Sequence, residues 1–561
     1  MNRPPGNASL LDELLVPAIA LAILVGATIW LTGQLAALLT HGAWPAVGAD
    51  DLGGIVARLV RAPGDPGSAW PAPVRDQLPG PVLFYAVLVG VGAAPVAIWV
   101  WWTERRRARR DLRPDAARWA TRRDLRPLRV RRPEPGRLTL GRDGGALLAA
   151  EPRQSVLVFG PTQTGKTTAL AIPAILEWPG PVVCTSVKTD LLRDTIDARR
   201  RVGDALVYDP TGQTGYLPSG WTPLSACVTW QGAQRTAAWL VDAARSRNAG
   251  IENSEFWFAA AGKLLAPVLL AAGIESGDMG DVMRWVDVQD MDDVRRILHR
   301  AGERAAFTVV EGIEAWEPRT RSSIYTTAQT VLAAYQDPAV LGSTLSADVT
   351  PDRLLGERPT TLYLCAPAHE QRRLQPLFAT LVNQLLHAAY ERAARGPLDP
   401  PLLVVLDECA NIAPIRELGN LAATAASHGI QLVTVFQDMS QVDAVYGRDR
   451  TPTIVNNHRA RLVLTGIADE RTLTYLERLI GETSATQTST TRIPGSRDSE
   501  TTQTAYRALA PAALLRSIPP GEAVLLYGHL HPARIRLRPW YREPGLRRLV
   551  RDPAAASSSD P

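Results

Sequence analysis

The chain is almost free of lysine. Only Lys166, Lys188 and Lys263 occur among its 61 lysine and arginine residues. Arginine can replace lysine at most solvated positions. A lysine that is retained therefore indicates a position where a wide, planar guanidinium does not fit. Lys166 is the clearest case, because it stands in the stretch GPTQTGKT between a strand-like and a helix-like run.

Cysteine is scarce as well. Cys184, Cys227, Cys365 and Cys409 lie far apart, no CxxC pair occurs, and the eight histidines are not clustered. This spacing argues against a zinc site and against a disulfide framework, and it fits a reducing compartment. We expect four small buried side chains.

The sequence also lacks a general excess of positive charge. The net charge is +5, but residues 103–134 hold 13 arginines against five acidic residues, which leaves the rest of the chain at −3. A protein that coats nucleic acid spreads basic residues over a whole face. Any contact with nucleic acid is therefore expected in a local groove or pore.

Charge is absent from two long apolar stretches, residues 14–39 and 81–102. About 20 apolar residues cross a bilayer, so each stretch is long enough. A cleaved signal peptide is excluded for the first, because the run is too long, Asp12 and Glu13 flank it, and a second stretch follows. The sequence predicts two transmembrane helices joined by a loop over 40–80.

Arginines indicate the orientation of these helices. The run TERRRARR follows Trp102 directly, and positively charged flanks stay in the cytoplasm. We expect residues 1–13 and the bulk of the chain in the cytoplasm, the loop outside, and the protein in the cell membrane. The basic juxtamembrane segment, 103–150, could instead bind nucleic acid, but its place beside a span favours topology and anionic lipid.

A glycine-containing loop predicts a nucleotide site. Residues 160–167 fit G-x-x-x-x-G-K-[ST], with the apolar run SVLVF before them and a helical pattern after them. Backbone N–H groups of such a loop surround phosphates, Lys166 reaches the β- and γ-phosphates of ATP, and Thr167 ligates Mg²⁺. The expected nucleotide-binding residues are Gly160, Pro161, Thr162, Gln163, Thr164, Gly165, Lys166, Thr167 and Thr168.

A second strand supplies acids. The run Leu402–Leu406 is apolar, and Asp407 and Glu408 follow it, at the strand end where open α/β sheets bind ligands. Asp407 is expected to hold Mg²⁺, usually through water, and Glu408 to orient and deprotonate the attacking water. The alternative is a pair of acids that caps a helix.

Further apolar runs complete a sheet. The stretch 429–441 ends its strand at Gln437, which is expected to contact the γ-phosphate as a catalytic residue with Glu408 and Lys166. Periodicity alone supports a surface loop residue there equally well. Strands are also expected in 179–192, 360–367 and 459–466. Their alternation with helices predicts an α/β, RecA-like P-loop NTPase fold with a parallel sheet.

One region breaks the alternation. Residues 230–340 show helical periodicity without a convincing strand, which predicts an all-α domain inserted between two parts of the nucleotide-binding domain, 151–229 and 341–541. Residues 482–504 are rich in Ser and Thr and are expected to be mobile, as is a flexible tail over 542–561.

Taken together, these motifs resemble the type IV secretion coupling proteins, the TraG/TraD-like conjugation ATPases. The resemblance runs from residue 15 to about 540. It includes ARWATRRDLRPL (117–128), GRLTLGR (136–142), YDPTGQTGYLPSGWTPL (208–224), SEFWFAAAGKLL, RSSIYTTAQTVLAAYQDP (321–338), LDECANIAPIREL and FQDMSQ. The last of these strengthens Gln437 as a γ-phosphate sensor.

The resemblance implies a membrane-anchored homohexameric ring. Such a ring uses ATP hydrolysis to pass relaxase-bound single-stranded DNA or protein cargo to the components of a type IV secretion channel, and the helical insert helps to select substrate. Two departures stand out. The stretch TAASHG (424–429) lacks the basic finger of many members, which leaves Arg416, Arg459 and Arg461 as candidates. TSVKTD (185–190) keeps Lys188 without the usual surroundings.

Two other functions remain open. An FtsK-type double-stranded DNA pump shares the membrane anchor and the ring ATPase, but it is expected to lack the helical insert and to end in a winged-helix domain. A docking scaffold would bind ATP to assemble and barely hydrolyse it, as the missing finger permits.

Overall fold

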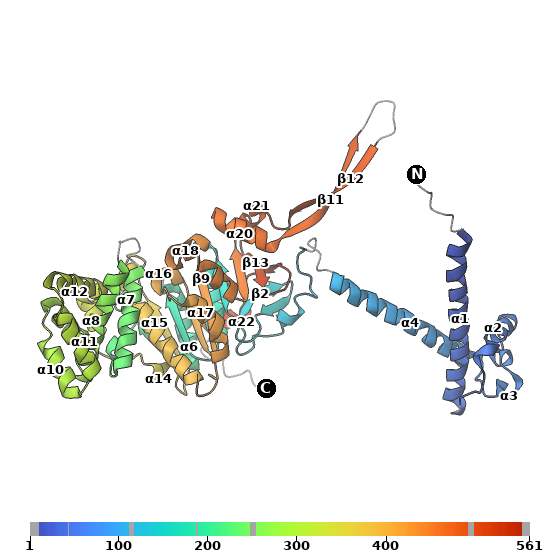
Figure 1. Cartoon of the computed structure of the whole chain (residues 1–561), viewed down its shortest axis with the longest axis horizontal. Coiled ribbons are helices and arrows are strands. Elements are labelled where there is room, and N and C mark those ends of the chain that lie inside the picture. The colour runs from blue at the N-terminus through green and yellow to red at the C-terminus, as the bar shows by residue number, and fades with distance from the viewer. Residues whose placement is uncertain are drawn as a thin grey trace, which may run out of the picture. The chain divides into compact units, whose positions relative to one another are not determined.

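The computed structural model describes residues 10–42, 44–110, 117–186, 189–246, 254–491 and 499–551. The chain forms two compact units, Met1–Ala116 and Ala117–Pro561, both drawn in Figure 1. Each unit has hydrophobic clusters of its own.

The first unit contains two long helices, α1 (Leu10–His41) and α4 (Pro81–Arg110). Between them lie η1 (Ala49–Asp51), α2 (Leu52–Arg61), η2 (Pro66–Ala69) and α3 (Ala72–Arg75). Trp70 and Phe84 meet edge to face with ring centroids 5.4 Å apart, and Ile55 is buried beside them. The loop over 40–80 is therefore a small packed structure on the end of α1 and the start of α4.

The second unit is built on a 12-stranded sheet. Its parallel part runs, in spatial order, through β10 (Ala460–Leu464), β4 (Val156–Phe159), β9 (Ile430–Phe436), β8 (Leu402–Leu406), β5 (Val182–Ser186), β7 (Thr360–Cys365) and β6 (Asp204–Tyr208). The predicted α/β fold with a parallel sheet is confirmed. The sequence did not predict β6.

An antiparallel extension continues the sheet beyond β10. It consists of β13 (Glu522–Tyr527), β14 (Ala533–Arg536), β2 (Thr139–Asp143), β3 (Ala146–Ala149) and β1 (Arg129–Val130). Segments from the two ends of this unit thus meet in one sheet, where Arg142 of β2 pairs with Arg536 of β14.

Burial on both faces explains the parallel strands. β8 and β9 are buried at every position. Leu157 and Phe159 of β4 face one hydrophobic core, shared with α15 (Gln371–Ala393), while Val156 and Val158 face another, shared with α5 (Ile172–Glu177) and α6 (Thr189–Val202). The sheet therefore lies between helical layers, as continuous apolar runs require.

Helices occupy the chain between β6 and β7. They include α7 (Trp230–Ser246), α8 (Ser254–Ile274), α9 (Met279–Val288), α10 (Asp292–Ala301), α11 (Arg304–Glu314), α12 (Pro318–Leu332) and α13 (Pro338–Gly342). We call residues 230–342 the helical segment; no strand occurs in its described residues. Figure 1 shows it at the end of the unit away from β2 and β13.

Within the described residues, one helical stretch is long and apolar enough to cross a membrane, Glu255–Ile274 of α8. It is 67% buried, and most of its apolar side chains belong to the hydrophobic core that the helical segment shares with one face of the sheet. The spans predicted at 14–39 and 81–102 fall in α1 and α4 and include side chains outside the described part, so they stay predictions.

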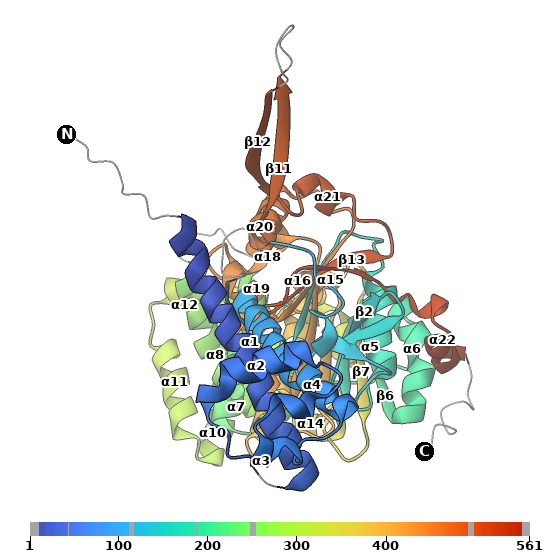
Figure 2. The same cartoon turned by 90° about the vertical axis from the view of Figure 1, so that its right-hand side faces the viewer.

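Two C-terminal segments that were expected to be mobile contain regular secondary structure. Residues 482–504, expected to be mobile, include most of the antiparallel ribbon of β11 (Glu482–Thr491) and β12 (Ser499–Ala508), which extends from α20 (Glu470–Ile480) in Figure 2. Threonine is β-branched and favours strands, so low hydrophobicity was a poor guide. The tail expected over 542–561 contains α22 (Pro544–Arg551), anchored by the buried Leu546; residues 552–561 lie outside the described part.

Candidate nucleotide-binding site

The glycine motif forms a tight loop between β4 and a continuous helical run, η4 (Thr167–Ala171, π-helical) and α5. Gly165 has a φ of +90°, which favours glycine, and Gln163 also adopts a left-handed φ of 65°. A Cβ on Gly160 would lie 2.9 Å from the Thr164 hydroxyl oxygen. The two glycines therefore permit a turn that a side chain would obstruct, as phosphate-binding loops require.

Lys166 lies inside this loop. Its side chain is 8% exposed, and its Nζ donates to the carbonyl oxygens of Gly160 and Pro161, both at 2.7 Å. An ammonium is compact enough to make both bonds within one turn, whereas a guanidinium is wide and planar. The enclosure of Nζ explains why this lysine is retained in an arginine-rich chain.

Asp407 comes directly after β8 and faces the loop. The Thr167 hydroxyl donates to Asp407 Oδ2 at 2.7 Å, and the Thr185 hydroxyl donates to the Asp407 carbonyl oxygen at 2.8 Å. Burial raises the pKa of Asp407 to about 6, although the Thr167 hydrogen bond and the Lys166 charge lower it. Its other oxygen, Oδ1, is buried without a hydrogen-bond partner in the described protein.

Glu408 has an unusual backbone. Its φ of 56° and ψ of 48° are left-handed, and its Oε2 accepts from Asn411 Nδ2 at 3.3 Å. A residue with a Cβ in this region costs about 1–3 kcal/mol, and such residues gather at functional sites. The strained turn lets Asp407 and Glu408 both face the same cleft.

One cleft of about 330 Å³ joins these groups. Its wall consists of loop residues, carboxylates and one aromatic side chain: Thr162, Gln163, Gly165, Lys166, Thr167, Thr168, Asp190, Asp407, Glu408 and Tyr541. Three carboxylates face one ammonium, so the wall suits a polyphosphate accompanied by a divalent cation.

The donor set fits Mg²⁺. The Thr167 hydroxyl and the orphaned Oδ1 of Asp407 are hard oxygen ligands, and Mg²⁺ usually takes one or two protein oxygens together with substrate phosphates and water. Within the described residues, no group of three or more His, Cys, Asp or Glu side chains forms a metal cage. A cation held partly by nucleotide agrees with this arrangement.

The structure does not bring all predicted residues into the cleft wall. The cleft wall does not include three residues of the loop, Gly160, Pro161 and Thr164. It also does not include Gln437, which directly follows β9. The Phe436 carbonyl accepts from the Gly160 N–H at 3.1 Å, so the backbone before Gln437 adjoins the loop. Lys188 lies outside the described residues.

Two of the three candidate finger arginines, Arg416 and Arg459, pair with acids of their own chain. Arg416 Nη1 lies 2.6 Å from Asp242 Oδ1 of α7, and Arg459 Nε lies 2.9 Å from Glu151 Oε2. Arg459 directly precedes β10 and Arg461 lies near its amino end, whereas the phosphate loop follows the carboxyl end of β4, which is parallel to β10. Within one chain, Arg459 and Arg461 therefore lie at the opposite end of the strands from the phosphate loop.

Two wall residues were missed from sequence. Asp190 lies in the first turn of α6, and its position shortly after the retained Lys188 was the available signal. Tyr541 lies in η8 (Trp540–Arg542), near the C-terminus. No local pattern marks it, because only the pairing of β14 with β2 and the following turn bring η8 to the loop.

Tyr541 offers a ring for a nucleotide base. It is 47% exposed and is the only aromatic member of the cleft wall in the described chain. We expect Tyr541→Ala to weaken ATP binding about 3- to 10-fold through lost stacking, with Tyr541→Phe near wild type. Titrations with ATP and with inorganic triphosphate check this; equal losses for both ligands would contradict a contact with the base.

Comparisons with known proteins agree with this geometry. Residues 115–560 match the family model described as "Type IV secretory system Conjugative DNA transfer". A conjugal transfer protein TraG of Escherichia coli is 26% identical over 361 residues, 59% of this chain and 55% of its own length. Protein VirD4 of Agrobacterium fabrum is 24% identical over 436 residues, 75% of this chain and 64% of its own length. The matches thus span only about half to two thirds of these relatives.

Solved structures share the fold. The bacterial conjugative coupling protein TrwBdeltaN70 superposes with a TM-score of 0.58 at 20% identity, over 75% of this chain and 91% of its own. TrwB in complex with ADP and Mg²⁺ superposes with a TM-score of 0.57 at 18% identity, over 75% of this chain and 92% of its own. The family match covers most of this chain and includes the whole cleft described above. The chain belongs to the type IV secretion system family of conjugative DNA-transfer coupling proteins.

Proposed function

We propose that this chain is a membrane-anchored ATPase that couples cargo to a type IV secretion channel and drives its export. The observation that carries the proposal is the hydrogen bond between Thr167 and Asp407, beside the enclosed Lys166 and the strained Glu408. It joins the phosphate loop to the acids of β8 in one cleft, as hydrolysis of a nucleoside triphosphate requires.

Each residue has a chemical role in this proposal. The loop N–H groups and Lys166 hold the β- and γ-phosphates and offset the negative charge that develops on transfer. Glu408 orients a water in line with the γ-phosphorus and accepts its proton. Gln437, one residue past the strand beside β4, is proposed to contact the γ-phosphate once the cleft is filled.

Thr167 and Asp407 would hold Mg²⁺, which neutralises phosphate charge when bound. Burial raises the pKa of Asp407, and a cation held beside it would favour its charged form. The hydrogen bond between Thr167 and Asp407 places these two oxygen ligands side by side. TrwB, the related structure, is described as a complex with ADP and Mg²⁺.

The cargo follows from the family. We propose relaxase-bound single-stranded DNA, protein, or both as cargo, because the family is described by conjugative DNA transfer. Assembly into a homohexamer is proposed from the resemblance to the TraG/TraD-like conjugation ATPases. A neighbouring subunit would supply the finger that TAASHG (424–429) lacks. Arg459 and Arg461 lie at the amino end of β10, whereas the phosphate loop of the same chain follows the carboxyl end of the parallel strand β4, so either arginine would act as a finger only on the nucleotide of a neighbouring subunit.

ATP hydrolysis by the full-length chain in lipid nanodiscs tests the proposal. Wild type is expected to hydrolyse ATP faster when single-stranded DNA is added, and Glu408→Gln is expected to stay at background under both conditions. ATP binding with no turnover above Glu408→Gln, with any nucleic acid, would overturn the motor and support the docking scaffold.

We further propose that α1 and α4 cross the cell membrane. In the described parts of these helices, large apolar side chains are exposed, among them Leu39 (71%), Val82 (86%) and Val89 (71%). A bilayer would cover such surface. The arginines after residue 102 would then fix the orientation, with the unit over 117–561 in the cytoplasm.

Cysteine labelling tests this topology without removing native thiols, because Cys184, Cys227, Cys365 and Cys409 are all buried. We expect Ala62→Cys, in the loop outside, to react with a membrane-impermeant maleimide in intact cells. Ala423→Cys, exposed in the second unit, should react only after the cells are opened. The reverse pattern would contradict the orientation.

A further inference from the structure

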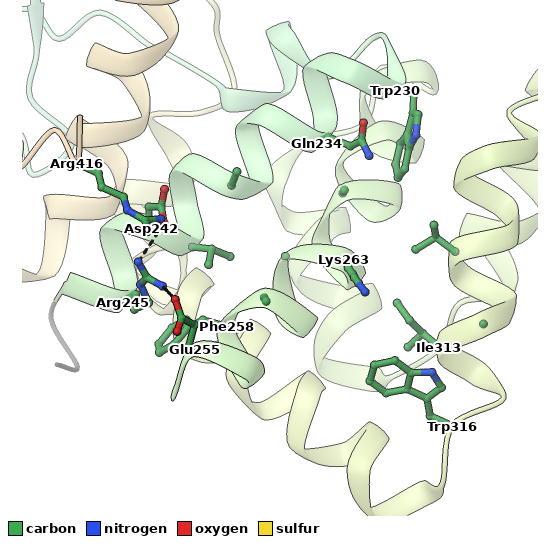
Figure 3. Close-up of a pocket in the computed structure, with 17 residues that line it drawn as sticks. Trp230, Gln234, Asp242, Arg245, Glu255, Phe258, Lys263, Ile313, Trp316 and Arg416 are labelled. Carbon is green, nitrogen blue, oxygen red and sulfur yellow. Dashed lines mark hydrogen bonds and ion pairs between the residues drawn. The ribbon is translucent and has the colours of Figure 1, made fainter. Parts of the chain in front are cut away.

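The helical segment contains a cavity of about 710 Å³ that plays no part in the nucleotide cleft. It lies between α7, α8 and α11, as Figure 3 shows. Its apolar wall includes the half-buried rings of Trp230 and Trp316 and the buried ring of Phe258. This size and this lining are typical of a binding site.

Small residues keep the cavity hollow. Ala238 of α7 and Ala259 and Gly262 of α8 all line it. A Cβ on Gly262 would lie 3.5 Å from Val241 Cγ2, an ordinary contact. The two helices therefore approach closely, and longer side chains at these positions would fill the space.

Charged residues at one end of the cavity satisfy one another. Arg416 lies 2.6 Å from Asp242, and Arg245 lies 3.3 Å from Glu255 and 3.9 Å from Asp242. Figure 3 shows these four side chains together, away from Trp230 and Trp316. Their charges sum to zero, so this end does not call for a charged ligand.

Lys263 differs from these four. It projects into the cavity between Gln234 and Ile313 in Figure 3, and no ion pair links it to any acid in the part of the chain that the structure describes. It is one of only three lysines. Lys166 of this trio lies in a site that needs a compact ammonium, and the position of Lys263 in a cavity wall indicates a similar need.

We propose that this cavity binds a peptide segment of a protein partner, one that presents an apolar side chain next to a carboxylate. The apolar side chain would lie against Trp230 and Trp316, and the carboxylate would pair with Lys263. Sites for small molecules bury most of their ligand, whereas Gln234, Ala259 and Lys263 are exposed at this mouth. An open mouth fits an occupant that is part of a larger chain.

Whether the partner is cargo or an accessory protein rests on the proposed function. Binding to the cavity itself needs no ATP hydrolysis. Calorimetry of the full-length chain in nanodiscs, without nucleotide, tests it. The probes are short capped peptides with Phe-Glu or Leu-Glu at the centre. Their matched controls carry Phe-Gln, Phe-Lys or Ser-Glu at the same place.

We expect the Phe-Glu and Leu-Glu peptides to bind about tenfold more tightly than the Phe-Gln and Phe-Lys controls, as a charge-assisted hydrogen bond predicts. The Ser-Glu control should bind about tenfold more weakly because it lacks the apolar side chain. With Lys263→Met, the Glu and Gln peptides should bind with about equal affinity. Changing Lys263 and the peptide Glu separately and together isolates the energy of the ion pair. Ala259→Leu, at an exposed position, should weaken binding of every peptide by filling the mouth. Thermal unfolding of both variants establishes that they fold.

Three outcomes would overturn the proposal: no binding of any probe at about 1 mM, a preference for Glu that survives Lys263→Met, or unchanged binding to Ala259→Leu. ATP hydrolysis in the same preparation separates the two proposals. Hydrolysis without peptide binding removes only the peptide site, and peptide binding without hydrolysis removes only the motor.

Discussion

Glu408→Gln is expected to lower kcat for ATP hydrolysis about 10²–10⁴-fold, the usual contribution of a general base, with ATP affinity nearly unchanged. Glutamine keeps the size of the side chain and the hydrogen bond from Asn411, but it cannot accept a proton from water. Steady-state turnover together with calorimetric ATP binding measures the two effects separately.

Glu417→Gln is the matched control. Glu417 lies on the same stretch of chain, but it is exposed and its nearest basic partner is Arg450 at 3.9 Å. This change should leave kcat unaltered. If Glu408→Gln retained the wild-type rate, another group would activate the water, and Asp190 in the same cleft would be the next residue to change.

Lys166→Ala is expected to lower kcat/KM for ATP about 10²–10³-fold, as loss of one preorganised donor to transferring phosphate does. Lys166→Arg should fail nearly as badly. The two carbonyls that hold Nζ lie 2.7 Å away, and a guanidinium cannot occupy the same enclosed position. Turnover and ATP binding of both variants provide the measurement.

Arg193→Lys, on the exposed face of α6, is the control for exchange between the two basic residues and should behave as wild type. Full activity of Lys166→Arg would show that the loop accepts a guanidinium, and enclosure of Nζ would then not explain why lysine is retained at this position.

The central strands were predictable from sequence because helices bury them on both faces. Leu402–Leu406 and Ile430–Phe436 read as unbroken apolar runs for that reason. Asp407, Glu408 and the glycine motif were predictable because each follows such a strand, and parallel strands present their carboxyl ends at one edge.

Other parts depended on distant contacts. Tyr541 reaches the cleft only through the pairing of β14 with β2, and α22 is helical where Leu546 is buried. The β11–β12 ribbon was missed because its pairing satisfies backbone groups without the apolar pattern that usually marks a strand. Gln437 is the opposite case, a residue that the sequence predicts in the site but that does not line the cleft. Its motif alone indicates a contact with the γ-phosphate.

Release of streptavidin from biotinylated single-stranded DNA tests the central claim most directly, because only a motor that moves along the strand displaces the bound protein. The full-length chain in nanodiscs is predicted to release streptavidin with ATP, and to fail with a non-hydrolysable analogue or as Glu408→Gln. Steady ATP hydrolysis without release from either end of the strand would contradict a DNA-translocating motor.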